Sequence, residues 1–187
     1  NDLQINFDQS FDNQDFSADA VGSTTITGWT VINEQIELGT TTIAGFTSPT
    51  DTTYPANNGV LGDTSAATGT FSTQVVQEDD DKSVQMRSSL TADDGYAVTR
   101  GPAIVSNSSV SVNVGDTISF DWKAEGGSDA YDVYGYLLNE DDGSTVELLN
   151  QTGTRTGSST LQLGMGVDGW IPASTNINIA GNYKFVF

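Results

Sequence analysis

Apolar residues in this 187-residue chain recur at every second position in short runs, and turn-forming residues separate the runs. Such alternation is typical of strands with one face in a core and the other in water. No window repeats apolar residues at helical spacing for more than about one turn. Many short strands without helices predict an all-β fold, which we expect to be a β-sandwich of jelly-roll-like topology.

The expected strands lie along the whole chain. They are Thr25–Asn33, Ile36–Leu38, Phe71–Val76, Ser83–Ser88, Tyr96–Thr99, Ser109–Val114, Asp116–Ala124, Tyr131–Asn139, Thr145–Leu149, Ser159–Leu163, Gly169–Ile171 and Asn182–Phe187. The acidic segment 139–143 ends in glycine between two apolar runs, which predicts a hairpin turn. Within one expected strand Ile118, Phe120 and Trp122 share a face, which predicts that this face lies in the core.

The length of the chain favours one domain over residues 1–187. The longest irregular segment that we expect runs from Thr40 to Gly69, and loops of this length usually carry function or are held by a metal. The chain starts at Asn1 without a signal-peptide pattern and stops within an apolar strand. We therefore expect a domain that has been excised from a larger multidomain protein.

The charge balance is strongly acidic, with six Lys and Arg against 25 Asp and Glu and a formal net charge of −19. Binding to nucleic acid phosphates requires clustered cations, so this class of partner is excluded, and we expect no insertion into membranes. Many carboxylates on a compact fold repel one another unless salt or bound cations relieve the repulsion. Short carboxylates in turns are typical calcium ligands, so we expect several Ca²⁺ ions that pin the long loops. A solvated acidic surface adapted to salt is the alternative.

The chain contains no Cys and no His. Disulfides, ordinary zinc sites and Ser-His-Asp or Cys-His catalytic sites are therefore excluded. The remaining enzymatic route is a pair of carboxylates, as in glycoside hydrolases. Among 25 acids some pair will have a suitable separation by chance, so we expect a binding protein rather than an enzyme.

Four acidic places are candidates for calcium: the run Glu78–Asp81, the turn at 139–142, the pair at 129 and 132, and the long loop at 51. The expected metal ligands are Asp51, Asp79, Asp80, Asp81, Asp129, Asp132, Asp141 and Asp142. Each place also fits a solvated turn that needs no metal. Neither the helix-loop-helix calcium pattern nor the glycine-rich nonapeptide repeat is present.

Several tyrosines lie close to the acidic segments, where aromatic side chains often contact ligands. We expect Tyr54, Tyr131 and Tyr134 to be ligand-binding residues. The three tryptophans, Trp29, Trp122 and Trp170, lie in strand-like contexts, and for them a place in the core is favoured over a ligand platform.

Several sequence phrases occur together in one known family. They are residues 28–33 (GWTVIN), 38–39 (LG), 43–46 (IAGF), 49–55 (PTDTTYP), 101–106 (GPAIVS), 119–124 (SFDWKA) and 129–138 (DAYDVYGYLL). Together they resemble the calcium-dependent peptide-binding domain near the tip of giant repeats-in-toxin adhesins of Gram-negative bacteria. The resemblance extends from about Phe7 to the end of the chain.

The resemblance implies a monomeric β-sandwich module that holds several calcium ions on the outside of a bacterial cell. One ion would coordinate the free C-terminal carboxylate of a surface protein on another cell and so mediate adhesion and biofilm formation. A partly coordinated calcium ion inverts the field of an acidic protein, so a carboxylate becomes a favourable ligand there. The alternatives are a carbohydrate-binding jelly roll, which would bind glycans, and a structural spacer in an adhesin stalk.

Overall fold

The computed structural model describes residues 3–6, 12–36, 38–50, 69–78, 80–90, 101–124, 131–153 and 170–187. Within these residues the chain forms strands and turns and no helix, which confirms the all-β fold class. The strands are β1 (Leu3–Asn6), β2 (Trp29–Ile32), β3 (Thr42–Ile43), β4 (Phe46–Thr47), β5 (Gly69–Glu78), β6 (Asp81–Leu90), β7 (Ala103–Ser106), β8 (Val110–Val112), β9 (Thr117–Trp122), β10 (Tyr131–Asn139), β11 (Thr145–Gly153), β12 (Ile171–Asn176) and β13 (Gly181–Val186). All pairings between these strands are antiparallel.

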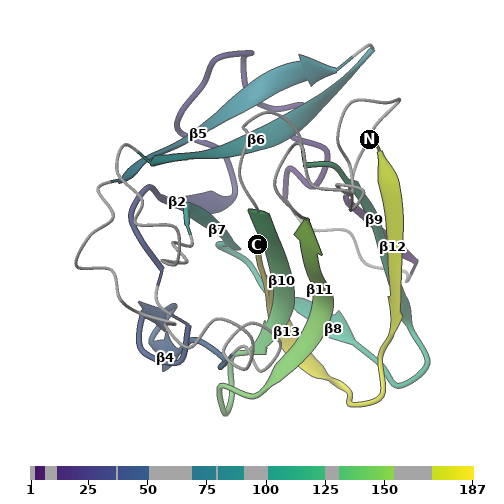
Figure 1. The fold of residues 1–187 in the computed structure, drawn as a ribbon. Helices are drawn as coiled ribbons and strands as arrows, with labels where there is room; N and C mark the ends of the chain where they lie inside the picture. Colours follow the sequence, from purple (N-terminus) through teal and green to yellow (C-terminus); the bar gives the residue numbers. More distant parts are fainter. Residues whose placement is uncertain are drawn as a thin grey trace.

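Two sheets form the body of the fold (Figure 1). One has six strands in the order β11-β10-β13-β7-β2 with β8 added beside β13, and the other has three strands in the order β1-β9-β12. Ile118, Phe120 and Trp122 of β9 are buried in one hydrophobic cluster with Leu137 of β10 and Phe185 of β13. The two sheets therefore pack face to face as a β-sandwich, and the expected core face of β9 is confirmed. The jelly-roll topology remains an expectation.

The six-stranded sheet is buried on its other face as well. A second hydrophobic cluster contains Val105 of β7, Tyr136 of β10 and Val186 of β13, together with Ile36 and Ile43. All four residues of β7 are buried, because both faces of this central strand are covered. Period-two alternation marks only strands with one wet face, and β7 is therefore missing from the strands that the sequence predicts.

The segment from Thr40 to Gly69 is not irregular throughout, contrary to expectation. Its described part contains the short hairpin of β3 and β4, with Ala44 and Gly45 at the turn in the left-handed region (φ 50° and 90°). Strands of two residues are too short to produce an alternation in the sequence. The rest of the segment, residues 51–68, lies outside the described residues.

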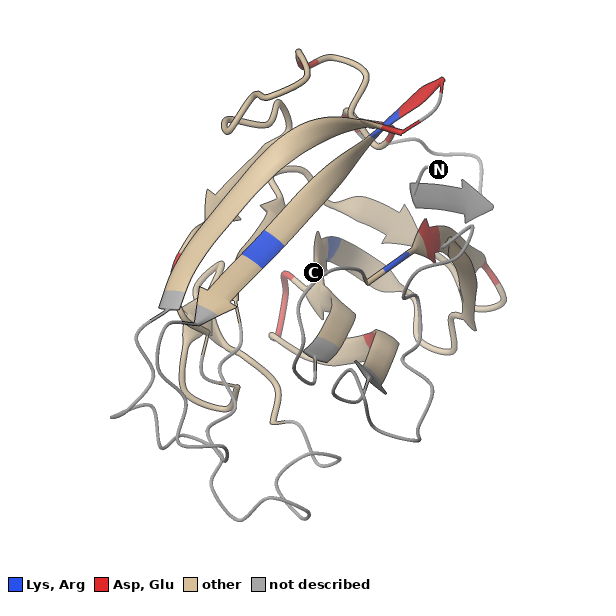
Figure 2. Ribbon diagram, turned by 45° about the horizontal axis from the view of Figure 1, so that its top comes forward, with Lys and Arg blue, Asp and Glu red and all other residues tan. Residues whose placement is uncertain are grey.

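A separate hairpin of β5 and β6 lies across the sandwich (Figure 2). Its ten cross-strand pairs end at Glu78 opposite Asp81, where the hairpin turns. Val75 of β5 is fully buried in the first hydrophobic cluster. The backbone of Val75 also exchanges two hydrogen bonds with Gly22 and Ser23, at N···O distances of 2.8 and 2.9 Å. These contacts fix the hairpin against the sandwich.

Other strand predictions have mixed outcomes. The strand expected at Tyr131–Asn139 is confirmed as β10, whereas β1 was not expected. The strand expected to end at Ile171 instead begins there and continues to Asn176. Pro172 argues against a strand in the sequence, but proline is tolerated on an edge strand such as β12. The strands expected at 96–99 and 159–163 lie outside the described residues.

Candidate functional site

Strand directions bring four strand ends together at one end of the sandwich. Trp122 at the end of β9 faces Ile171 at the start of β12, and Tyr131 at the start of β10 faces Gly153 at the end of β11. Trp122, Ile171 and Gln151 of β11 line one cavity between the two sheets. We call this the upper end, as it is drawn in Figure 1, and the end with the β10–β11 turn the lower end.

The tip of the β5–β6 hairpin lies at the upper end. Glu78, the last residue of β5, accepts a hydrogen bond from Lys123 at 2.8 Å, and Lys123 directly follows β9. The ammonium group of Lys123 also lies 5.1 Å from the ring centroid of Trp170, just before β12. Asp80 and Asp81 at the tip are exposed, and Figure 2 shows the acidic colouring of this tip.

A second expected metal position lies at the same end. Asp132 is the second residue of β10 and pairs with Thr152 of β11, next to Gln151 in the cavity lining. The fold thus brings the backbone position of Asp132 and the carboxylates of Asp80 and Asp81 to the upper end. In the sequence these positions are separated by about fifty residues, so only the tertiary structure relates them.

Four expected site residues are not covered by the structure. The residues outside the described part of the chain are Asp51, Tyr54, Asp79 and Asp129. Among the described residues, no group of three or more carboxylates converges in a way that could hold a metal ion.

Asp141 and Asp142 lie at the lower end, in the turn between β10 and β11. The Asp142 carboxylate accepts a hydrogen bond from the Ser144 amide at 2.8 Å, and the hydrogen bonds from Ser144 lower the pKa of Asp142. The amide of Asp141 donates to the Asn139 side-chain oxygen at 2.9 Å. The structure therefore confirms the hairpin turn and separates its two aspartates from the acidic residues of the upper end.

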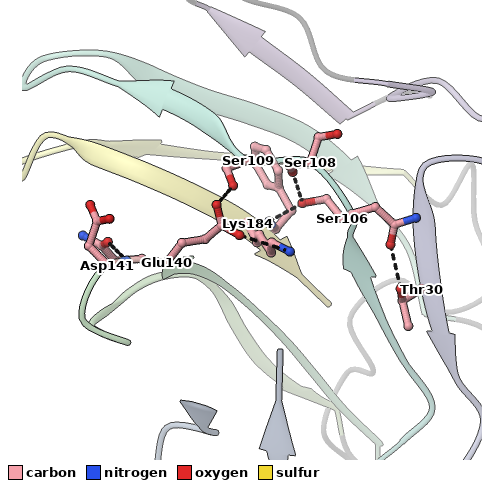
Figure 3. A network of polar contacts seen from close by, with 10 residues as sticks. Thr30, Ser106, Ser108, Ser109, Glu140, Asp141 and Lys184 are labelled. Carbon is pink, nitrogen blue, oxygen red and sulfur yellow. Dashed lines mark hydrogen bonds and ion pairs between the residues drawn. The ribbon is translucent and has the colours of Figure 1, made fainter. Parts of the chain in front are cut away.

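A polar network ties this turn to neighbouring strands (Figure 3). Glu140 pairs with Lys184 of β13 at 3.1 Å and accepts a hydrogen bond from the Ser109 hydroxyl. The hydroxyl of Ser106 on β7 accepts a hydrogen bond from the Phe185 amide at 2.9 Å. The charge of Glu140 is thus partly compensated by a lysine. We assign a structural role to this part of the turn.

Of the expected ligand-binding tyrosines, the structure describes the side chain of Tyr134 and the backbone of Tyr131, whereas Tyr54 lies outside the described residues. Tyr134 is half-buried, and its ring centroid lies 5.7 Å from that of Tyr136. Tyr136 is buried in the second cluster, and its hydroxyl has no hydrogen-bond partner among the described residues. Burial, and then the neighbouring Tyr134, raises the pKa of Tyr136. The backbone of Tyr131 begins β10 at the upper end, three residues before Tyr134.

The loop before β2 is an acidic feature that sequence reasoning missed. The Asp19 carboxylate accepts hydrogen bonds from the Thr27 amide, the Thr27 hydroxyl and the Asn13 side chain, at 2.8 to 2.9 Å. Burial, which raises the pKa of Asp19, is outweighed by these hydrogen bonds, which lower it. Lys82 donates to the backbone carbonyl oxygens of Ser17 and Asp19. In the sequence, this loop could have been inferred from the frequent Asp and Asn residues at positions 12–19.

The cavity between the sheets has a volume of about 330 Å³. Its lining residues come from β9, β11 and β12: Trp122, Leu148, Leu149, Gln151, Ile171, Pro172, Ala173 and Ser174. The Thr175 hydroxyl of β12 donates a hydrogen bond to the carbonyl oxygen of Leu148, one of the lining residues, at 3.5 Å. This contact joins β11 and β12 across the two sheets.

Fold and site together define an all-β sandwich with acidic turns at both ends. No protein-family model, curated protein or solved structure matches this chain. The described residues include no helix of the length and apolar character needed to cross a membrane.

Proposed function

We propose that this chain is a calcium-dependent peptide-binding module of a bacterial surface adhesin, which recognises free C-terminal ends of proteins on other cells. The observation that carries the proposal is that two separate acidic segments, the β5–β6 tip and the start of β10, lie at the same end of the sandwich, the end at which Trp122, Ile171 and Gln151 line a cavity. Loops that meet at one end of a sandwich are a common location for binding sites.

Calcium explains how so acidic an end could bind a carboxylate. Glu78 of the hairpin tip pairs with Lys123, and Asp80 and Asp81 at the same tip are exposed. An acidic surface repels an incoming anion, and a partly coordinated Ca²⁺ ion reverses the sign of the local field. Asp129 and Asp132, and the long loop with Asp51, would supply further ligands in this proposal.

The central experiment compares a peptide that has a free C-terminal carboxylate with the same peptide as a C-terminal amide, by calorimetric titration in calcium. The amide removes both the charge and the coordinating oxygen, so the loss should exceed that of one ordinary hydrogen bond, about 1.5 kcal/mol. That corresponds to a Kd increase of more than about tenfold. Binding of the acid should also disappear in excess chelator. Equal affinities for acid and amide would rule out this mechanism.

A carbohydrate-binding module receives less support from the described residues. A sugar site would use either exposed coplanar aromatic rings or a calcium ion contacted by vicinal hydroxyls. Trp29 and Trp122 are buried, as expected for core residues, and do not supply such rings. Trp170 is half-buried and lies under Lys123. A calcium-dependent signal on a glycan array, together with no binding to free C-terminal peptides, would favour the carbohydrate function instead.

A further inference from the structure

The body of the β5–β6 hairpin contains no acidic residue, although the chain as a whole is strongly acidic. Asp and Glu are absent from residues 69–77 and from residues 82–90, so the carboxylates of the hairpin lie only at its tip (Figure 2). Two of the six basic residues of the chain, Lys82 and Arg87, lie in β6. The hairpin body therefore differs in charge from the rest of the chain.

The two faces of the hairpin differ in burial. Thr73 and Val75 of β5 are fully buried, and Val84 and Met86 of β6 pack against the first hydrophobic cluster. A strand directs alternate side chains to opposite faces, so the residues between these positions form the outer face. We call this outer face the hairpin face, and its residues, all exposed or half-buried, are Thr70, Ser72, Gln74, Gln85, Arg87 and Ser89.

The strand register places the polar groups of the hairpin face side by side. Ser72 lies directly opposite Arg87, and Gln74 lies directly opposite Gln85. The Gln74 side-chain amide donates a hydrogen bond to the Gln85 side-chain oxygen at 2.9 Å, which orients both amides beside Arg87. The hairpin face is therefore an ordered set of hydroxyl, amide and guanidinium groups without a carboxylate.

Arg87 is a cation without an anionic partner among the described residues. The structure describes four of the six basic side chains, and the other three are engaged. Lys82 donates to backbone carbonyl oxygens, and Lys123 and Lys184 each pair with a glutamate. Arg87 is exposed and forms no ion pair or hydrogen bond within the described part of the chain. In a chain with 25 acidic residues, this guanidinium remains available to a ligand anion.

The chemistry of the hairpin face matches a sugar that carries a carboxylate. A guanidinium binds a carboxylate through two parallel N–H donors. Serine hydroxyls and glutamine amides both donate and accept hydrogen bonds, as sugar hydroxyls do. One arginine balances one carboxylate, whereas the net charge of −19 would repel a ligand with many. An acidic peptide also offers a carboxylate, but it lacks the surrounding hydroxyl groups.

We propose that the hairpin face is a second binding site, which takes a sugar residue with a single carboxylate from a glycan. Arg87 binds the carboxylate, and Ser72, Gln74 and Gln85 bind the hydroxyl groups. Unlike the sugar site considered above, this one uses neither a calcium ion nor an aromatic platform. It also lies apart from the acidic tip and the start of β10, so it goes beyond the proposed peptide-binding function.

The probe is the trisaccharide sialyllactose, which has one carboxylate, and lactose is the matched neutral sugar. In an NMR titration of the isotope-labelled chain in calcium, sialyllactose should shift the amide signals of residues 70–74 and 85–89. Lactose should bind at least about tenfold more weakly, because it lacks the charged hydrogen-bond acceptor. Equal affinities for the two sugars, or no binding of sialyllactose, would overturn the proposal.

Substitution of Arg87 tests the role of the guanidinium. Arg87→Gln changes an exposed side chain and should raise the Kd for sialyllactose at least about tenfold. Lys184→Gln is the matched control, because it removes the same charge from β13, and its Kd should equal that of the wild type. A calcium ion at the acidic tip would still bind the sugar carboxylate in Arg87→Gln, so a wild-type Kd in this variant would contradict the site.

A carboxylate added opposite Arg87 tests the same contact from the protein side. Ser72→Asp places an acid directly across the strand pair from Arg87, where it should compete with the ligand and weaken binding at least about tenfold. Ser111→Asp adds the same charge at an exposed position of β8 and should leave the Kd unchanged. Equal losses in both variants would show general repulsion and overturn the assignment to Arg87.

A peptide probe separates a sugar site from a site for acidic peptides. The acetylated and amidated tripeptide Gly-Glu-Gly has one carboxylate and no sugar hydroxyls, so it should bind more weakly than sialyllactose. Tighter binding of this peptide would overturn the assignment to a carboxylated sugar and assign the hairpin face to acidic peptides.

Discussion

Gly143, in the turn between β10 and β11, is a position where both the backbone conformation and the neighbouring side chain favour glycine. Its φ of +75° lies in the left-handed region, and a Cβ atom there would lie 2.2 Å from Cδ1 of Phe46. Gly143→Ala should therefore destabilise the fold by about 2–4 kcal/mol, the sum of backbone strain and overpacking. Gly115→Ala is the matched control, because Gly115 has a φ of +94° but nothing within 4 Å of the Cβ position. Urea unfolding of both variants separates the two contributions, and equal losses would contradict the contact with Phe46.

The hydrogen bonds of the Asp19 carboxylate predict how the stability of the fold depends on pH. Its hydrogen bonds with Thr27 and Asn13 lower its pKa below the ordinary value of 3.8. A lowered folded-state pKa stabilises the protein above the unfolded pKa, and this stabilisation is lost as pH falls through the folded value. Asp19→Asn should cost about 1 kcal/mol at pH 7, and the difference from wild type should shrink below about pH 4. Melting curves at pH 7 and pH 3 measure this, with Asp12→Asn, at an exposed neighbour, as the control. A difference that does not change with pH would show that the carboxylate charge is not involved.

At the scale of elements, the β5–β6 hairpin and the β10–β11 hairpin present acidic turns at opposite ends of the sandwich. In the lower turn the Asp142 carboxylate accepts a hydrogen bond from the Ser144 amide, whereas the proposed function assigns calcium ligands to the exposed Asp80 and Asp81 at the upper end. If these two aspartates are calcium ligands as proposed, the double variant Asp80→Asn/Asp81→Asn should weaken calcium binding at least about tenfold, because each substitution removes a charged oxygen. Asp141→Asn/Asp142→Asn removes the same charge at the lower end and should leave the calcium Kd of the upper end unchanged. Calorimetric titration with calcium measures both, and a larger effect of the second variant would place the ion in the other turn.

At the scale of the whole molecule, the net charge of −19 predicts that stability depends on cations, which would relieve repulsion between the carboxylates. Calcium at about a hundred times its Kd would stabilise the fold by about 2.7 kcal/mol. For a chain of this length, that corresponds to a rise in Tm of about 5–10 °C. Excess chelator at low salt should reverse the rise, and magnesium should substitute poorly because it requires near-ideal octahedral geometry. Melting temperatures that are unaffected by chelator would contradict the dependence on calcium.

The sequence by itself determined the fold class and most individual strands, because one-sided burial imposes a period of two on residues such as Ile118, Phe120 and Trp122. It also determined the absence of cysteine and histidine chemistry, since that follows from composition alone. It could not reveal β7, whose two faces are both covered, or the continuation of β12 through Pro172. Only the tertiary structure decided at which end of the sandwich each acidic segment lies. Asp80 and Asp81 lie at the upper end because Glu78 pairs with Lys123, which follows β9, whereas Asp141 and Asp142 lie at the opposite end. Local sequence fixes the period of a strand, but long-range pairing and the packing of two sheets fix which strand ends are neighbours.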